Sequence, residues 1–243
     1  MIIDNPEIAD LETSSADYAS RFAGRAGAYM LQVQSEAVRA VLADCPPGRV
    51  LDVGGGHGQL VDLLAELGWQ VTVMGSSPDC GTNLRTLHRK TRCDYLTADL
   101  LHAPFPDQSF DLVVSVRLLP HTTRWEALVA EMCRLAGRWV VVDYPSTGGF
   151  NALTPLLFGM KKRFERNTRT YRSFATAELD REFGHSRFLR RATRKQFLLP
   201  MVVHRASGSA APVRWMESLG RALGLTALAG SPVVARFDRE AAR

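Results

Sequence analysis

Short apolar runs alternate with amphipathic stretches along most of this chain. Five runs have the composition of strands, most of them apolar enough to be buried on both faces of a sheet. They lie at residues 50–53, 70–74, 93–99, 112–116 and 139–145. Between them, apolar residues recur at helical spacing, as over 60–67 and 125–136. The alternation predicts an α/β fold with a doubly wound, mostly parallel sheet.

The two ends of the chain carry a different pattern. Residues 1–15 are polar without a clear period, which indicates a loose or short-helical lead. Apolar positions from 17 to 42 predict one or two helices, broken near Gly24 and Gly27. We therefore expect an N-terminal helical cap over 1–47 and a main domain over 48–243. The elements expected after the fifth strand are a helix at 176–183, a sixth strand at 196–204, a helix at 215–223 and a last strand at 232–237.

Glycines cluster where the first strand meets the first helix of the main domain. The sequence there reads Leu51-Asp52-Val53-Gly54-Gly55-Gly56-His57-Gly58-Gln59. Glycines let the backbone turn sharply and approach a ligand closely. A dinucleotide fingerprint would place its third glycine where Gln59 stands. Asp52 would also repel a pyrophosphate but attract an ammonium group, so a nicotinamide-dependent reductase is disfavoured.

Two stretches resemble the class I S-adenosylmethionine-dependent methyltransferases. Residues 51–58 are similar to the first motif of that family. The run Phe105-Pro106-Asp107-Gln108-Ser109-Phe110-Asp111 is similar to one common in its small-molecule, methyltransferase type 11-like branch. The resemblance implies a seven-stranded, Rossmann-like methyltransferase fold with an antiparallel last strand. It also implies S-adenosylmethionine as the cofactor.

The resemblance further implies which residues bind the cofactor. We expect Asp52, Gly54, Gly55, Gly56, Gly58, Gly75, Ser76, Asp99, Leu100 and Val116 to do so. Asp99 matches the family's aspartate at the adenine amino group. The family's acid for the ribose hydroxyls falls at position 75, where this chain has glycine. Either Ser76, Ser77 or Asp79 replaces that acid, or the cofactor site is weakened or lost.

A catalytic base is needed only if the acceptor loses a proton, because methyl transfer from a sulfonium is an in-line displacement. His121 and Tyr144 are the candidates, since both follow predicted strands at the edge where such sheets bind ligands. His57 is a third candidate. For each of them, a purely structural role as a capping or core residue is the alternative. Arg117 is a candidate partner for a substrate carboxylate or phosphate.

Residues near the N-terminus are candidates for covering the cofactor. In the family that this chain resembles, N-terminal helices often have that role. Tyr18, Arg21 and Phe22 lie in such a predicted helix. Packing of the helix on the sheet would explain Tyr18 and Phe22 equally well.

Composition adds modest constraints. The chain has 243 residues and a formal net charge of +5, which permits acidic partners without requiring them. Its four cysteines are scattered without a Cys-x-x-Cys pair, so we expect reduced thiols, no metal site and a cytoplasmic location. No run of 18 apolar residues and no cationic start before an apolar block occurs, so neither a membrane-spanning helix nor a signal peptide is expected.

Positive charge is concentrated late in the chain. Residues 158–195 hold twelve Lys or Arg against four Asp or Glu, next to an apolar stretch at 153–160. A solvated helical face would explain this, and so would a basic lid at about 150–175 over an anionic, aromatic or lipid-like acceptor. The lid would permit peripheral membrane contact. RNA is a weaker candidate, because residues 117–120 lack the Pro-Pro-aromatic motif that holds a flipped base.

These observations predict S-adenosylmethionine-dependent methyl transfer to a small molecule. Two alternatives stay open: a cofactor-poor scaffold or regulatory subunit, favoured by Gly75, and an RNA methyltransferase, favoured by the basic segment. The acceptor, the methylated atom and the oligomeric state are not predicted by the sequence.

Overall fold

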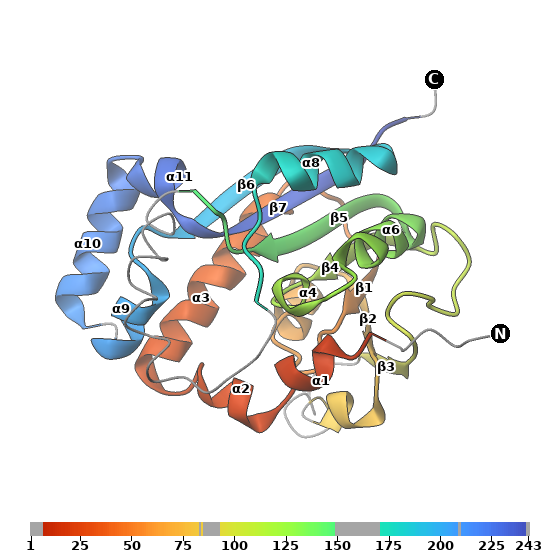
Figure 1. The fold of residues 1–243 in the computed structure, drawn as a ribbon, viewed down its shortest axis with the longest axis horizontal. Helices are drawn as coiled ribbons and strands as arrows, with labels where there is room; N and C mark the ends of the chain where they lie inside the picture. Colours follow the sequence, from red (N-terminus) through yellow and green to blue (C-terminus); the bar gives the residue numbers. More distant parts are fainter. Residues whose placement is uncertain (1–6, 83, 85–92, 149–170, 209, 242–243) are drawn as a thin grey trace.

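The computed structural model describes residues 7–82, 84, 93–148, 171–208 and 210–241 (Figure 1). Its centre is a seven-stranded sheet of order β3-β2-β1-β4-β5-β7-β6. The strands are β1 (Arg49–Val53), β2 (Gln70–Gly75), β3 (Asp94–Thr97), β4 (Phe110–Ser115), β5 (Ala136–Tyr144), β6 (Phe188–Phe197) and β7 (Ser231–Arg239). Strands β1 to β5 pair in parallel, and β7 pairs antiparallel with both β5 and β6. The predicted fold class, including the antiparallel last strand, is confirmed.

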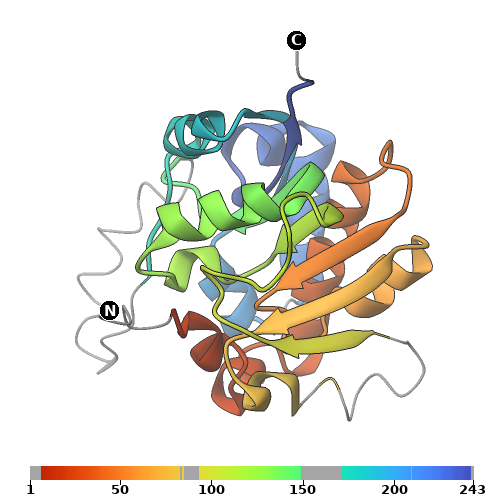
Figure 2. The same ribbon diagram turned by 90° about the vertical axis from the view of Figure 1, so that its right-hand side faces the viewer.

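Helices cover both faces of the sheet (Figure 2). The α-helices are α1 (Ala9–Thr13), α2 (Ala16–Ser20), α3 (Gly24–Val41), α4 (Val61–Glu66), α6 (Trp125–Leu135), α8 (Thr176–His185), α9 (Met201–Ala206), α10 (Ala211–Ala222) and α11 (Leu225–Ala229). Two short 3-10 helices, η1 (Pro78–Gly81) and η2 (Leu119–His121), follow β2 and β4.

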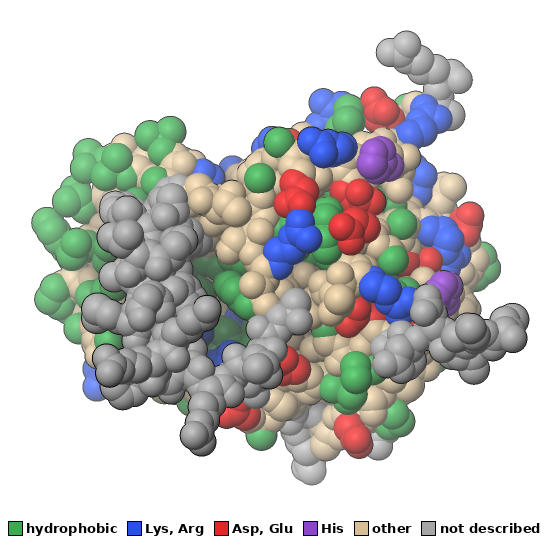
Figure 3. All heavy atoms as spheres, viewed as in Figure 1, with side chains coloured by type: hydrophobic (Ala, Val, Ile, Leu, Met, Phe, Trp, Pro, Cys, Tyr) green, Lys and Arg blue, Asp and Glu red, His purple; other side chains and the backbone are tan. Residues whose placement is uncertain are grey.

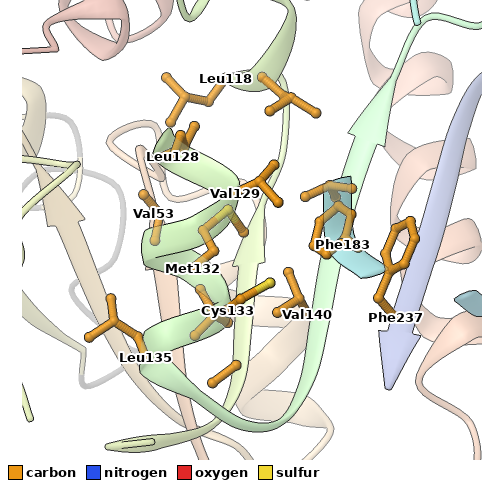
Figure 4. Packing of buried hydrophobic residues seen from close by; sticks show 14 of the residues in the cluster. Val53, Leu118, Leu128, Val129, Met132, Cys133, Leu135, Val140, Phe183 and Phe237 are labelled. Carbon is orange, nitrogen blue, oxygen red and sulfur yellow. The ribbon is translucent and has the colours of Figure 1, made fainter. Parts of the chain in front are cut away.

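Apolar side chains fill the space between the sheet and each helical layer. On one face, Val129 and Met132 of α6 lie close to Val140 of β5 (Figure 4). Phe183 of α8 stacks on Phe237 of β7 with ring centroids 3.8 Å apart. On the other face, side chains from α3 and α4 form a second buried cluster with β1, β2 and β4. The two layers fix the sheet, and with it the positions of the loops at its carboxyl edge.

Two predicted elements are wrong. The sixth strand lies at Phe188–Phe197, and not at 196–204. Among the described strands it pairs with β7 alone, so it lies at the edge of the sheet. Several of its side chains are exposed, and arginines occupy exposed positions there. The apolar run that mimicked a strand contains Pro200, after which helix α9 begins. Gly27 does not break a helix either: it lies within α3, where a Cβ atom would come 1.8 Å from the carbonyl oxygen of Phe22.

The segment between β6 and β7 leaves apolar side chains exposed. They gather over α10 and α11 on the left of Figure 3, and Trp215 on α10 is 65% exposed. The apolar stretch at 153–160, for which membrane contact was predicted, and all but the last few residues of the predicted lid lie outside the described residues. Within the described part of the chain, no helix is long and apolar enough to cross a membrane.

Candidate active site

The glycine loop after β1 has a conformation that requires glycine. Gly54 and Gly58 have φ angles of 73° and 64°, a region that side chains disfavour. The N–H of Gly54 donates to the carbonyl of Met74 on β2 (2.8 Å), which ties the loop to the next strand. A Cβ atom on Gly55 would lie 2.1 Å from a carboxylate oxygen of Asp52. The loop therefore wraps closely around that carboxylate before α4 begins.

Asp52 is a buried carboxylate with no compensating partner among the described residues. Its residue is 2% exposed, and no described group donates a hydrogen bond to its side chain. Burial raises the pKa of Asp52 to about 7. A buried charge is unfavourable unless it is paired, so this position is prepared for a cationic group.

A small cavity lies against the loop and the carboxylate. Its lining residues are Thr13, Tyr18, Asp52, Gly54, Gly55, His57, Gln59, Leu60, Val116 and Arg117. They come from the N-terminal segment, the glycine loop and the end of β4. Burial lowers the pKa of His57, although a backbone hydrogen bond with Thr13 acts in the opposite direction. Arg117 is the permanent cation of the lining.

Arg117 is held rigidly beside this cavity. It has a φ of 63°, which is strained for a residue with a side chain. Its N–H donates to Asp143 Oδ1 (2.5 Å), Nη2 donates to Gln34 Oε1 (2.6 Å), and the guanidinium lies 3.7 Å above the Phe22 ring. Its Nη1 is buried and has no hydrogen-bond partner among the described residues. Nη1 therefore remains available to donate to an anionic oxygen.

The residues expected at the nucleoside lie along the ends of β2 and β3. Gly75 ends β2 and Ser76 follows it. Asp99 accepts hydrogen bonds from the N–H of Leu101 (3.0 Å) and from His102 (3.1 Å). Burial acts to raise the pKa of Asp99, but these hydrogen bonds outweigh it and the pKa is lowered. Asp99 is thus a half-buried anion, with Leu100 fully buried next to it.

The two predicted catalytic residues occupy different environments. His121 in η2 contacts Tyr18 and Tyr171 through its ring, with centroids 5.7 and 5.6 Å away. Tyr18 in turn stacks on His57 (6.5 Å), so these rings form a wall beside the cavity. Tyr144 instead is 1% exposed inside the core, where its hydroxyl lies 3.4 Å from Thr176 Oγ1. The structure brings His121 towards the cavity and keeps Tyr144 in the core.

Gly56 is the glycine of the loop with the closest contact to a neighbouring segment. A Cβ atom there would lie 2.3 Å from the carbonyl oxygen of Cys80 and 2.5 Å from Ser14 Oγ. We expect Gly56→Ala to displace the loop and to lower the free energy of unfolding by about 1–3 kcal/mol, measured by urea denaturation. The same change at exposed Gly184, where a Cβ atom meets nothing within 4 Å, is the control. Equal stability of the two variants would contradict this account of the loop.

Comparison with known proteins gives the family. Residues 51–138 match a family described as a methyltransferase domain, and the sheet order described above is that of its Rossmann-like class. Over these residues the chain carries an S-adenosylmethionine-dependent methyltransferase domain. The predictions of family, enzyme class and cofactor are confirmed.

Among curated proteins, this methyltransferase is similar to Probable tRNA methyltransferase 9B of Mus musculus. The two are 31% identical over 112 residues, which is 44% of this chain and 24% of the relative. The chain thus spans about a quarter of that relative's length.

Two solved structures share the fold of this methyltransferase. Magnesium protoporphyrin IX methyltransferase from Synechocystis PCC 6803, with bound SAH, is 16% identical, with 94% of this chain and 97% of that chain covered and a TM-score of 0.66. An S-adenosylmethionine-dependent methyltransferase from Thermotoga maritima is 18% identical, with 86% and 89% covered and a TM-score of 0.57.

Other expectations concern cysteines and metals. All four cysteines are free. In the described ranges, no group of three or more His, Cys, Asp or Glu side chains is arranged to hold a metal ion.

Proposed function

We propose that this methyltransferase transfers the methyl group of S-adenosylmethionine to a small-molecule acceptor. The carrying observation is that Asp52, to which no described group donates a hydrogen bond, and Arg117, whose Nη1 has no partner among the described residues, line one cavity beside the glycine loop. An α-amino acid is a zwitterion: its ammonium group complements Asp52 and its carboxylate complements Arg117. This match favours the methionine end of the cofactor over a pyrophosphate.

The residues of the site position and desolvate the reacting groups. When bound, the cofactor supplies an electrophilic methyl group on a sulfonium. Asp52 and Arg117 would hold its amino-acid end, while the backbone of 54–58 lies alongside. Asp99 and Leu100 would hold the adenine, with Gly75, Ser76 and Val116 completing the predicted contacts. Positioning of this kind can supply a large part of the acceleration in an in-line displacement.

The acceptor is proposed to approach past the aromatic wall of Tyr18, His57, His121 and Tyr171. The N–H of Arg172 donates to the carbonyl of Pro120 (2.9 Å), and its guanidinium lies 5.0 Å from the Trp125 ring centroid. The last residues of the proposed lid therefore lie next to η2. Aromatic rings and a nearby cation suit an aromatic or lipid-like acceptor with an acidic group.

The test of this function is turnover with a panel of phenols, amines and aromatic or acyl-chain acids. Formation of S-adenosylhomocysteine above the rate without acceptor supports a small-molecule enzyme. If the cofactor binds but no panel member is methylated, the small-molecule proposal loses its support. If the cofactor does not bind at all, the scaffold alternative is favoured.

His121 is the proposed general base for acceptors that lose a proton. We expect His121→Phe, which keeps a ring against Tyr18, to lower kcat by about 10²–10⁴-fold without weakening S-adenosylhomocysteine binding. Tyr144→Phe is the control, expected to keep kcat because its hydroxyl lies in the core. Rates are measured with the acceptor found in the panel. Equal losses in both variants, or none in His121→Phe, would remove His121 from this role.

RNA is the second candidate acceptor, and the similarity to Probable tRNA methyltransferase 9B over 112 residues favours it. Backbone contacts make such binding fall steeply with salt. An electrophoretic shift of tRNA at low salt that disappears as salt rises would support RNA. No shift at low salt would remove it.

A further inference from the structure

The N-terminal segment from Glu7 to Ser14 follows the same path as the proposed cofactor. That path runs along the carboxyl ends of β3, β2 and β1, where sheets of this kind bind nucleotides. At the β2 end, the side chain of Asp10 on α1 reaches a residue 66 positions away in the sequence. Ser76 N–H donates to Asp10 Oδ2 (2.6 Å), and Ser76 Oγ–H donates to Asp10 Oδ1 (2.5 Å).

Asp10 also occupies space that an acid at position 75 would use. A Cβ atom built on Gly75 would lie 3.2 Å from Asp10 Oδ2 and 2.3 Å from the hydroxyl of Tyr95. Tyr95 is fixed there because its hydroxyl donates to the carbonyl of Ser77 (2.6 Å). The side chain of Asp10 is completely buried. The donors expected to face the nucleoside are therefore satisfied by the protein itself.

The rest of the segment contacts the glycine loop. Thr13 lines the cavity of Asp52, and Ser14 Oγ lies 2.5 Å from the Cβ position of Gly56. Two successive parts of the cofactor path, the β2 end and the glycine loop, thus carry contacts from one stretch of eight residues. At the β2 end, a bound cofactor would need the space that Asp10 takes.

The segment has little helical stability of its own. Helix α1 has five residues and no side-chain hydrogen bond at its N-cap, Ile8. Ile8 and Leu11 are 51% and 38% exposed. Isolated helices this short are marginal, so contacts with the rest of the protein, those of Asp10 among them, keep α1 in place.

We propose that Glu7–Ser14 is an autoinhibitory segment that occupies the cofactor path, with Asp10 as its anchor on Ser76. This inference rests on the proposed function. Only molecules in which the segment is displaced bind the cofactor. The apparent Kd is therefore the intrinsic Kd divided by the fraction of such molecules. Loss of the anchor raises that fraction.

The experiment compares S-adenosylhomocysteine binding by calorimetry in three full-length proteins: wild type, Asp10→Ala and the control Asp17→Asn. Asp17 is an exposed acid of α2. We expect Asp10→Ala to bind S-adenosylhomocysteine at least about 10-fold more tightly than the wild type does. Asp17→Asn should bind it like the wild type. Hydrogen–deuterium exchange of wild type should show faster exchange of amides 9–14 when S-adenosylhomocysteine is added. This second measurement does not depend on the folding of a variant.

The contradicting outcomes are distinct. Equal or weaker binding by Asp10→Ala, or protection of amides 9–14 by the ligand, would overturn the inference and make α1 a part of the cofactor site. Failure of both wild type and Asp10→Ala to bind would overturn the proposed function as well. Binding by Asp10→Ala alone would support both.

Discussion

Asp52→Asn is expected to stabilise the cofactor-free protein and to remove most of its cofactor affinity. Burial raises the pKa of Asp52 from 3.8 to about 7, so at pH 8 the folded state carries an unfavourable buried charge. Removing that charge should raise the free energy of unfolding at pH 8 by about 2–4 kcal/mol. Losing the partner of an ammonium group should weaken S-adenosylhomocysteine binding by about 100-fold. Urea denaturation and calorimetry measure the two effects.

The sign of the pH dependence follows from the raised pKa. The folded state binds the proton of Asp52 more tightly than the unfolded state does. Its contribution therefore favours folding at low pH and is lost as the pH rises from about 4 to 7. Wild type and Asp52→Asn should accordingly differ at pH 8 and converge near pH 4. Asp62→Asn, at an exposed position of α4, is the control. A destabilised Asp52→Asn at pH 8, or one with unchanged affinity, would contradict a site prepared for a cation.

Arg117→Met is expected to weaken S-adenosylhomocysteine binding by about 10- to 100-fold while keeping the apolar stem against Phe22. The reason is that Nη1 is a buried donor without a described partner, in a residue that lines the cavity. The variant should bind the decarboxylated analogue, which has no carboxylate to lose, about as well as the wild type does. Calorimetry with the two ligands measures the difference.

Arg138→Met is the matched control for Arg117→Met. Arg138 is an exposed β5 residue whose guanidinium lies 4.1 Å from the Trp139 ring centroid. The Arg138→Met variant should bind both ligands like the wild type. An equal loss for both ligands in Arg117→Met would indicate a structural role, through the side-chain contacts with Gln34 and Phe22, and would contradict carboxylate binding.

The strand, loop and helix around Asp52 could be predicted from the sequence because local rules agree there. An apolar strand, glycines at positions of positive φ and a helical period all point to one structure. The sixth strand could not be predicted in the same way. An edge strand that pairs with β7 on one side and faces water on the other does not need a continuous apolar pattern. Residues such as Arg190 and Arg194 therefore resemble those of a surface segment in the sequence.

Position 75 and the N-terminal lead show a second limit of sequence reasoning. The sequence shows glycine in place of an acid at position 75, but it does not show the reason. The Tyr95 hydroxyl on β3 occupies the space that a Cβ atom at position 75 of β2 would need. Asp10 was part of a polar stretch with no period. Only the fold brings it to Ser76, and no local pattern marks that contact.

Titration of wild type and Asp10→Ala with S-adenosylhomocysteine at pH 8 and pH 6 tests the central claim most directly. The account predicts saturable micromolar binding at one site, tighter at pH 8, where Asp52 is ionised, than at pH 6. Absence of binding heat from both proteins, or binding that is equal at the two pH values, would contradict a cofactor held by Asp52 in the glycine loop.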